Sequence, residues 1–248
     1  MMAFFRQGIL SGTMKTLILI LTLSFGPGLF WLGYFLYRDR LSPEPARLVM
    51  KVFFAGILSA VPAILFELPF QGLFLISTVF VAPVVEEIMK YTSVVVCVGR
   101  RSEFDEPMDG IVYASAAALG FASIENLFYL SALYGESSFS TIAFFRAVLT
   151  VPGHALWSSM WGFAYGMSRC RPESSRTVTL GGGLLLGIAF HALFNFLLHL
   201  WIPGTILLLA ATVFFWRSTL KRISLALQSR SPDPPPLPVR NHPPHSES

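Results

Sequence analysis

Seven apolar stretches of about 20 residues follow one another along the chain, and this pattern limits the fold more than any other feature. Each stretch is long enough to cross a hydrocarbon core about 30 Å thick as a helix. Charged residues make up only 13% of the 248 residues, whereas a soluble domain has about 25%. We therefore expect an all-α fold, a polytopic transmembrane helical bundle of about seven spans that is embedded in a lipid bilayer. The predicted spans are residues 17–37, 48–68, 72–98, 110–134, 142–168, 178–199 and 201–220.

The two ends of the chain differ from these spans. Residues 1–16 are predicted to form a short N-terminal interfacial segment, and residues 17–222 a transmembrane domain. A cleaved signal peptide is not expected, because the run from Leu17 to Tyr37 is too long for its apolar core and ends in basic residues. Residues 223–248 are predicted to form a disordered, Pro-rich cytoplasmic tail, since the run Ser231–Pro238 can neither form a helix nor bury a core.

Basic residues gather in alternate loops and after the last span. They are Arg38, Arg40 and Arg47, then Arg100 and Arg101, then Arg169, Arg171 and Arg176, and finally Arg217, Lys221 and Arg222. By the positive-inside rule these regions are cytoplasmic, which places the N-terminus outside and the C-terminus inside. Arg6, Lys15 and Arg146 are then the basic residues expected on the outer side. Because the cations lie in short clusters between spans rather than along one polar face, no nucleic-acid partner is expected.

Two carboxylates and an amine lie inside the third predicted span, in the segment Glu86-Glu87-Ile88-Met89-Lys90. Ionisable side chains in hydrocarbon are costly, so they indicate function or pairing. Helical spacing places Lys90 one turn from Glu86 and three residues from Glu87. Two adjacent carboxyl groups beside one ammonium should not both ionise, so one can act as a base and the other as an acid. The alternative is a charged staple that holds two helices together.

Three further spans carry polar residues at a similar depth. Glu125 and Asn126 lie in the fourth predicted span, His154 in the fifth, and His191 and Asn195 in the sixth. At about 1.5 Å per residue, Glu86, Glu125, His154 and His191 all lie roughly 18 to 21 Å from the cytoplasmic ends of their spans. We therefore expect them to meet at one level. As single residues, Glu125 could be a protonated acid that bonds a neighbouring helix, and each His a hydrogen-bonded packing residue.

These motifs resemble those of the PrsW family of intramembrane proteases, within the wider group that includes the CAAX prenyl endopeptidases. The matching segments are Pro43-Glu44-Pro45, Glu86-Glu87-x-x-Lys90, Phe104–Tyr113, Gly120-Phe121-Ala122-x-x-Glu125-Asn126, His154-Ala155 and His191–Asn195. The resemblance implies that residues 17–222 are a protease domain with an internal hydrophilic cavity, in the inner membrane of a bacterium. It also implies membrane-anchored protein substrates, such as regulatory anti-sigma factors. Asn195 stands where some PrsW relatives have Asp, which argues against a mechanism that needs a carboxylate there.

Peptide hydrolysis requires an activated water, a stabilised oxyanion and a proton for the leaving amine. The predicted mechanism uses Glu86 or Glu87 as the general base, with Lys90 tuning the pair and Glu125 helping to hold the water. His154, His191 and Asn195 would polarise the scissile carbonyl, and Asn126 is predicted to be a supporting residue of the site.

No cofactor is expected, although His154 and His191 with a carboxylate offer the ligands of a zinc site. The sequence has no His-Glu-x-x-His pair, and Lys90 already supplies positive charge beside the carboxylates. Two other classes of function stay open at this point. Buried Glu, His and Lys also form the proton relays of transporters, and a non-catalytic membrane scaffold could share this architecture.

Overall fold

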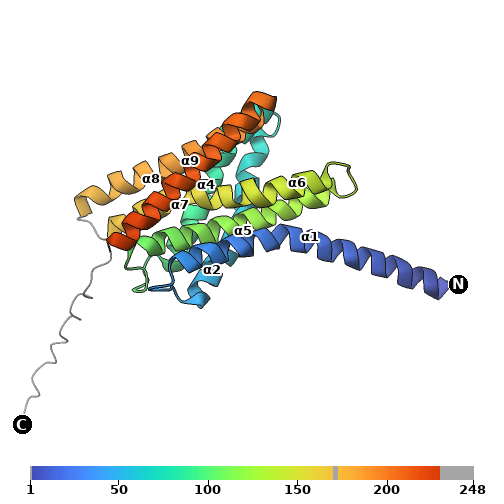
Figure 1. Ribbon diagram of the computed structural model, residues 1–248, viewed down its shortest axis with the longest axis horizontal. Helices are drawn as coiled ribbons and strands as arrows, with labels where there is room; N and C mark the ends of the chain where they lie inside the picture. Colours follow the sequence, from blue (N-terminus) through green and yellow to red (C-terminus); the bar gives the residue numbers. More distant parts are fainter. Residues whose placement is uncertain (1, 170–172, 230–248) are drawn as a thin grey trace, which may run out of the picture.

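The computed structural model describes residues 2–169 and 173–229, and all regular structure in these residues is helical (Figure 1). The α-helices are α1 (Met2–Arg38), α2 (Ala46–Glu67), α3 (Phe74–Ile76), α4 (Ala82–Val98), α5 (Pro107–Leu133), α6 (Phe139–Phe145), α7 (Val151–Arg169), α8 (Glu173–Leu198) and α9 (Trp201–Gln228). A π-helical turn, Ser77–Val81, joins α3 to α4, and a second one, Arg146–Thr150, joins α6 to α7. The described part of the chain therefore forms seven continuous helical rods.

The prediction of an all-α bundle of about seven helices is confirmed. Five rods in the described residues are long and apolar enough to cross a membrane, namely Thr13–Arg38, Ala46–Phe70, Pro107–Leu133, Phe139–Arg169 and Thr177–Leu198. The other two rods, α3–α4 and α9, correspond to the predicted spans 72–98 and 201–220. Large apolar side chains such as Leu17, Phe54 and Val96 are exposed on the outside of the bundle. Such a surface requires lipid around it, so the chain is an integral membrane protein.

The helices at the two ends of the predicted transmembrane domain, α1 and α9, extend beyond its bounds. Helix α9 continues to Gln228, six residues past residue 222, where the transmembrane domain was predicted to end. Residues 223–228 extend the helix because Ile223 and Ala226 are fully buried in the core. Residues 230–248, with the Pro-rich run, lie outside the described residues. Helix α1 passes through residues 2–16 without a break, and the interfacial position of residues 1–16 stays a prediction.

Helix α5 is the central element of the bundle. It lies between α7 on one side and α1 and α2 on the other (Figure 1). Small residues allow this close contact, because a Cβ atom on Gly120 would overlap the carbonyl oxygen of Phe53 in α2. A Cβ on Gly110 would likewise overlap the carbonyl oxygen of Gly162 in α7. Glycine at these positions lets the helix backbones touch, which is how helices associate closely in a membrane.

The first turn of α5 is fixed by a capping box. The Asp109 carboxylate accepts hydrogen bonds from the backbone N–H groups of Asp105 and Glu106, at 3.0 and 2.7 Å. Glu106 is the N-cap of the helix, and Asp109 is its third residue. The Tyr113 hydroxyl donates to Glu44, which ties α5 to the loop before α2. Burial raises the pKa of Glu44 to about 9.

Candidate active site

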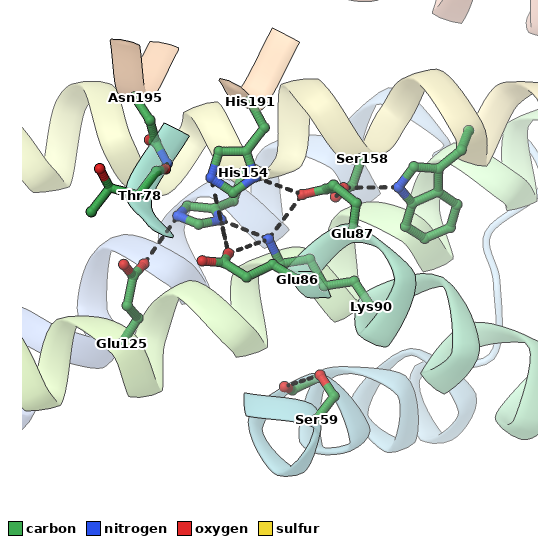
Figure 2. Close-up of polar contacts among 12 residues, drawn as sticks. Ser59, Thr78, Glu86, Glu87, Lys90, Glu125, His154, Ser158, His191 and Asn195 are labelled. Atoms are coloured by element: carbon green, nitrogen blue, oxygen red, sulfur yellow. Dashed lines mark hydrogen bonds and ion pairs between the residues drawn. The ribbon is translucent and has the colours of Figure 1, made fainter. Parts of the chain in front are cut away.

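Helix α4 supplies the centre of the site, the Lys90 ammonium (Figure 2). Lys90 has no exposed surface, and its Nζ donates to Glu86 Oε2 at 3.0 Å and to Glu87 Oε1 at 2.9 Å. The third hydrogen of the ammonium faces Nδ1 of His154 on α7, at 2.9 Å. All three donors of the amine therefore have a partner, which allows a cation to be buried at this position. Lys90 pairs with both carboxylates rather than with one, as a simple staple would.

The contacts of His154 determine which of its nitrogens carries the proton. Lys90 can only donate, so Nδ1 of His154 accepts, and the ring hydrogen of the neutral imidazole is on Nε2. That nitrogen lies 3.1 Å from Oε2 of Glu125 on α5. His154 thus connects the charges of α4 to the carboxylate of α5. Figure 2 shows its ring between the Lys90 amine and the Glu125 carboxylate.

Glu87 lies behind the site and uses both of its oxygens in the protein. Oε2 accepts from Ser158 Oγ at 2.6 Å and from Trp161 Nε1 at 2.9 Å. Oε1 accepts from Lys90 and lies 3.2 Å from Nδ1 of His191 on α8. Because an ionised carboxylate only accepts, Nδ1 of His191 is the donor to Glu87 and Nε2 is left for another partner. Glu87 is completely buried, so it has no free lone pair facing open space.

Glu86 and His191 face each other across the other side of the cluster. Nε2 of His191 lies 4.0 Å from Oε2 of Glu86, and Nδ1 of His154 lies 3.8 Å from the same oxygen. The His191 ring stacks on Trp157, with the ring centroids 4.2 Å apart. This stacking and the contact to Glu87 fix the orientation of the imidazole. The expected meeting of Glu86, Glu125, His154 and His191 at one level is thereby confirmed.

Arg146 is the main residue that the sequence interpretation missed. Its Nη2 lies 3.1 Å from Oε2 of Glu125, the same oxygen that faces His154. Its Nε donates to Oδ1 of Asn126 at 2.5 Å, and its guanidinium lies over the Tyr129 ring at 4.2 Å. Arg146 had been counted only as an outer-side charge. Its position inside the predicted span 142–168 was the available signal, because a cation there calls for a partner.

Asn195 lies apart from the Lys90 cluster, at the π-helical turn before α4 (Figure 2). Its Nδ2 donates to the backbone carbonyl of Thr78 at 2.9 Å. One turn later, His199 Nδ1 lies 2.8 Å from the carbonyl oxygen of Asn195, and its Nε2 lies 3.4 Å from the Thr78 hydroxyl. The amide of Asn195 is thus engaged with the backbone rather than with Glu86 or His191. His199 therefore belongs to this second polar group.

A cavity of about 450 Å³ lies beside these residues, within the usual size range of ligand sites. Glu86, Glu125, His154, His191 and Asn195 line it, together with Arg146, Thr78 and His199. Its α2 wall includes Ala60 and Ala63, whose small side chains leave space opposite the carboxylates. Glu87 and Lys90 are not part of the lining. The cavity therefore receives one carboxylate of the Glu86-Glu87 pair and not the other.

The residue types of the site also suit a metal ion. One donor atom each from Glu86, His154 and His191 can be chosen so that all three lie within 4.8 Å of one another. Zinc binds such ligands at about 2.0–2.2 Å, which requires them to lie closer together than that limit. The Lys90 ammonium also donates to two of the three side chains, to Glu86 at 3.0 Å and to His154 at 2.9 Å. The donor set is chemically suitable, whereas the present positions of these atoms suit the ammonium.

Comparisons with known proteins bear on the identity of the chain. The sequence profile of a family described as PrsW family intramembrane metalloprotease matches residues 44–219. A protein named Protease PrsW from Oceanobacillus iheyensis is 33% identical over 214 residues, which cover 84% of this chain and 95% of that one. Protease PrsW of Bacillus subtilis is 30% identical over 213 residues with the same coverage, and that of Geobacillus kaustophilus is 32% identical over 177 residues, covering 69% of this chain and 76% of that one.

No solved structure matches the chain significantly. The matches to proteases favour a peptidase over the transport and scaffold alternatives, and they confirm the resemblance seen in the sequence motifs. The profile covers more than half of the chain, and the first two relatives align over most of it. The chain therefore belongs to the PrsW family and is an intramembrane peptidase.

Proposed function

We propose that the protein cleaves membrane-anchored protein substrates with a water molecule that Glu86 activates, and that it does so without a metal. The observation that carries this proposal is that the two adjacent carboxylates differ in their access to the cavity. Glu86 lines the cavity and lies beside Lys90, His154 and His191, whereas Glu87 is buried behind them. A general base must reach the water that it deprotonates, and this requirement selects Glu86.

Glu87 supports the reaction by orienting His191, although it does not line the cavity itself. Its Oε1 lies 3.2 Å from Nδ1 of His191, so the opposite nitrogen, Nε2, points toward Glu86 and the cavity. When Nε2 is protonated, it can donate to the scissile carbonyl oxygen, and the Glu87 carboxylate stabilises the imidazolium charge. The same arrangement of carboxylate and imidazole orients the catalytic histidine in serine proteases. In this proposal His191 polarises the carbonyl and Glu87 holds His191 in place.

Lys90 and His154 keep the base in position. The ammonium contacts both carboxylates and fixes Glu86 through a 3.0 Å hydrogen bond. His154 donates from Nε2 to Glu125, and both residues line the cavity, where they border the space for the attacking water. Asn195 is assigned a different role from the one predicted, because its amide is engaged with Thr78. It shapes the cavity wall by holding the π-helical turn.

The substrate class follows from the position of the site. The reacting groups lie on helices that cross the membrane, so the substrate must bring a peptide bond into the bundle. Proteins anchored by a single helix, such as regulatory anti-sigma factors, are the class that we propose. The basic loops around Arg38, Arg100, Arg169 and Arg217 support a cytoplasmic C-terminus in a bacterial cell membrane.

A zinc-dependent form of the same hydrolysis is the second candidate, because the matched family is described as a metalloprotease. Glu86, His154 and His191 would hold the ion, which would act as a Lewis acid on the scissile carbonyl. Lys90 would then have to give up its contacts to Glu86 and His154. The two forms differ in whether the purified, active protein contains stoichiometric metal.

The proposal is tested by reconstituting the purified protein in liposomes with candidate single-span substrates. Glu86→Gln should lower the cleavage rate by about 10²- to 10⁴-fold, the usual contribution of a general base. Glu103→Gln is the matched control, because Glu103 is a glutamate in the loop after α4 that does not line the cavity. Full cleavage by Glu86→Gln would refute the assignment of the base. Loss of cleavage in the Glu103→Gln control would show that the assay reports folding instead.

A further inference from the structure

A second pocket lies at the opposite end of α2 and α4, two of the helices that border the active-site cavity. The active-site cavity contacts α2 at residues 60–67 and the start of α4, including Ala82. The second pocket, of about 530 Å³, contacts α2 at Lys51 and the end of α4 together with the turn that follows it. It is lined by Lys51, Val95, Val96, Cys97, Gly99, Arg100 and Arg101. This pocket is separate from the catalytic residues.

Three of the lining residues are cations, Lys51, Arg100 and Arg101. Lys51, Arg100 and Arg101 are exposed, and none of their side chains makes an ion pair or hydrogen bond within residues 2–169 and 173–229. Glu103 is an acidic neighbour outside the lining. Hydrogen bonds from its own backbone and from Ser102, with the nearby Arg101 and Arg47, lower the pKa of Glu103. One carboxylate beside three cations leaves an excess of positive charge at this pocket.

The C-terminal end of α4 also contributes to the charge at this pocket, because the last carbonyl groups of a helix carry partial negative charge. Arg169, at the end of α7, contacts the carbonyl groups of the C-cap residue and of the turn that follows α4. Its Nη1 donates to the carbonyl oxygen of Gly99 at 2.6 Å, and its Nη2 donates to that of Arg101 at 3.2 Å. The carbonyls at the pocket therefore already have a cationic donor. The charge that a ligand meets is that of Lys51, Arg100 and Arg101.

The opposite part of the lining is apolar. Val95, Val96 and Cys97 belong to the last turn of α4, and the Val96 side chain is 77% exposed on the lipid-facing surface. The cations are near the level at which α2 begins, at Ala46, and α4 ends, at Val98. This is the boundary between hydrocarbon and water. A ligand that suits the pocket combines a negative headgroup at that boundary with an acyl chain along Val95 and Val96.

We propose that this pocket binds the phosphate of an anionic phospholipid through Lys51, Arg100 and Arg101. Phosphatidylglycerol is a representative of this class of lipid. Each cation near a membrane surface increases the affinity for anionic lipid by about 5-fold. The three cations together contribute on the order of a hundredfold. A zwitterionic lipid of the same chain length has no net charge, so we expect it to bind more weakly than the anionic lipid. Inorganic phosphate shares the headgroup chemistry but lacks the chain that contacts the valines.

The experiment measures lipid binding by native mass spectrometry of the purified full-length protein. Phosphatidylglycerol, phosphatidylcholine and inorganic phosphate are titrated separately. Wild type should retain phosphatidylglycerol at least 10-fold more tightly than phosphatidylcholine. The variant K51Q/R100Q/R101Q should lose on the order of a hundredfold in affinity for phosphatidylglycerol, and K51Q alone about 5-fold. The matched control is R40Q/R217Q/K221Q, which removes three exposed cations outside the pocket and should change the affinity less than about 3-fold.

Three results would overturn the proposal. Equal affinities for the two lipids in wild type would show that the pocket does not recognise the charge, and this result does not depend on whether the triple variant folds. Equal losses in the triple variant and in its control would show that only total charge matters. Inorganic phosphate that binds as tightly as phosphatidylglycerol would assign the pocket to a free anion. None of these readouts requires proteolysis, so they are independent of the proposed catalytic function.

Discussion

Replacing Arg146 by Gln tests how the carboxylate of α5 is held. The guanidinium lies 3.1 Å from Glu125, and the two side chains expose 11% and 24% of their surface. Exposed ion pairs contribute about 0.2–1 kcal/mol, and removing one partner from a fully buried pair costs about 3–5 kcal/mol. This pair lies between those limits, so we expect Glu125 and Arg146 to be coupled by about 1–3 kcal/mol. Because the same Glu125 oxygen faces His154, cleavage should also fall by about 10- to 100-fold.

The coupling is measured with a double-mutant cycle of Glu125→Gln, Arg146→Gln and the double variant. Stability is followed by thermal unfolding in detergent, and activity by cleavage in liposomes. Lys15→Gln is the control, since Lys15 is an exposed basic residue that was also predicted on the outer side. If the changes in the free energy of unfolding caused by the two substitutions add to within about 0.5 kcal/mol, Glu125 and Arg146 are not coupled and the prediction is wrong. Residues in contact should not behave independently.

Three further predictions concern packing, pH and metal. Gly120→Leu should destabilise the protein by about 1–3 kcal/mol, because the added side chain meets the carbonyl oxygen of Phe53. The melting temperature should fall for this variant and not for Gly33→Ala, where a Cβ meets no atom within 4 Å. Since the pKa of Glu44 is raised to about 9, the folded state binds more protons than the unfolded state, and its contribution to stability is lost as the pH rises toward 9. The melting temperature of wild type should therefore fall between pH 5 and 9, and Glu44→Gln should reduce this fall, whereas equal slopes would contradict the prediction. Chelators should leave cleavage by the purified protein unchanged, and stoichiometric zinc whose removal abolishes cleavage would favour the metal form instead.

The helices and the meeting of the site residues were predictable from simple physical rules. Lengths of apolar sequence fix the number of spans, because every span must cross the same hydrocarbon thickness. Counting residues from the span ends placed Glu86, Glu125, His154 and His191 at a common depth, and their contacts confirm it. The rule works because rise per residue is nearly constant in a helix.

Other features depend on contacts that one sequence does not reveal. The π-helical turns before α4 and α7 interrupt two of the predicted spans, and neither turn contains Gly or Pro. The Thr78 carbonyl that engages Asn195 belongs to the first of these turns, so the partner of that amide could not be foreseen. The buried position of Glu87 is set by Ser158 and Trp161 of another helix. The choice between the two adjacent glutamates therefore required the tertiary structure.

The most direct test of the central claim is an experimental structure of the Glu86→Gln variant bound to a substrate segment. With Glu86 as the base, we expect the scissile carbonyl carbon to lie in the cavity beside residue 86, with a water about 3–3.5 Å from that carbon. Nε2 of His191 should lie within hydrogen-bond distance of the carbonyl oxygen. A substrate bound elsewhere on the bundle, with its scissile bond out of reach of residue 86 and His191, would contradict the account.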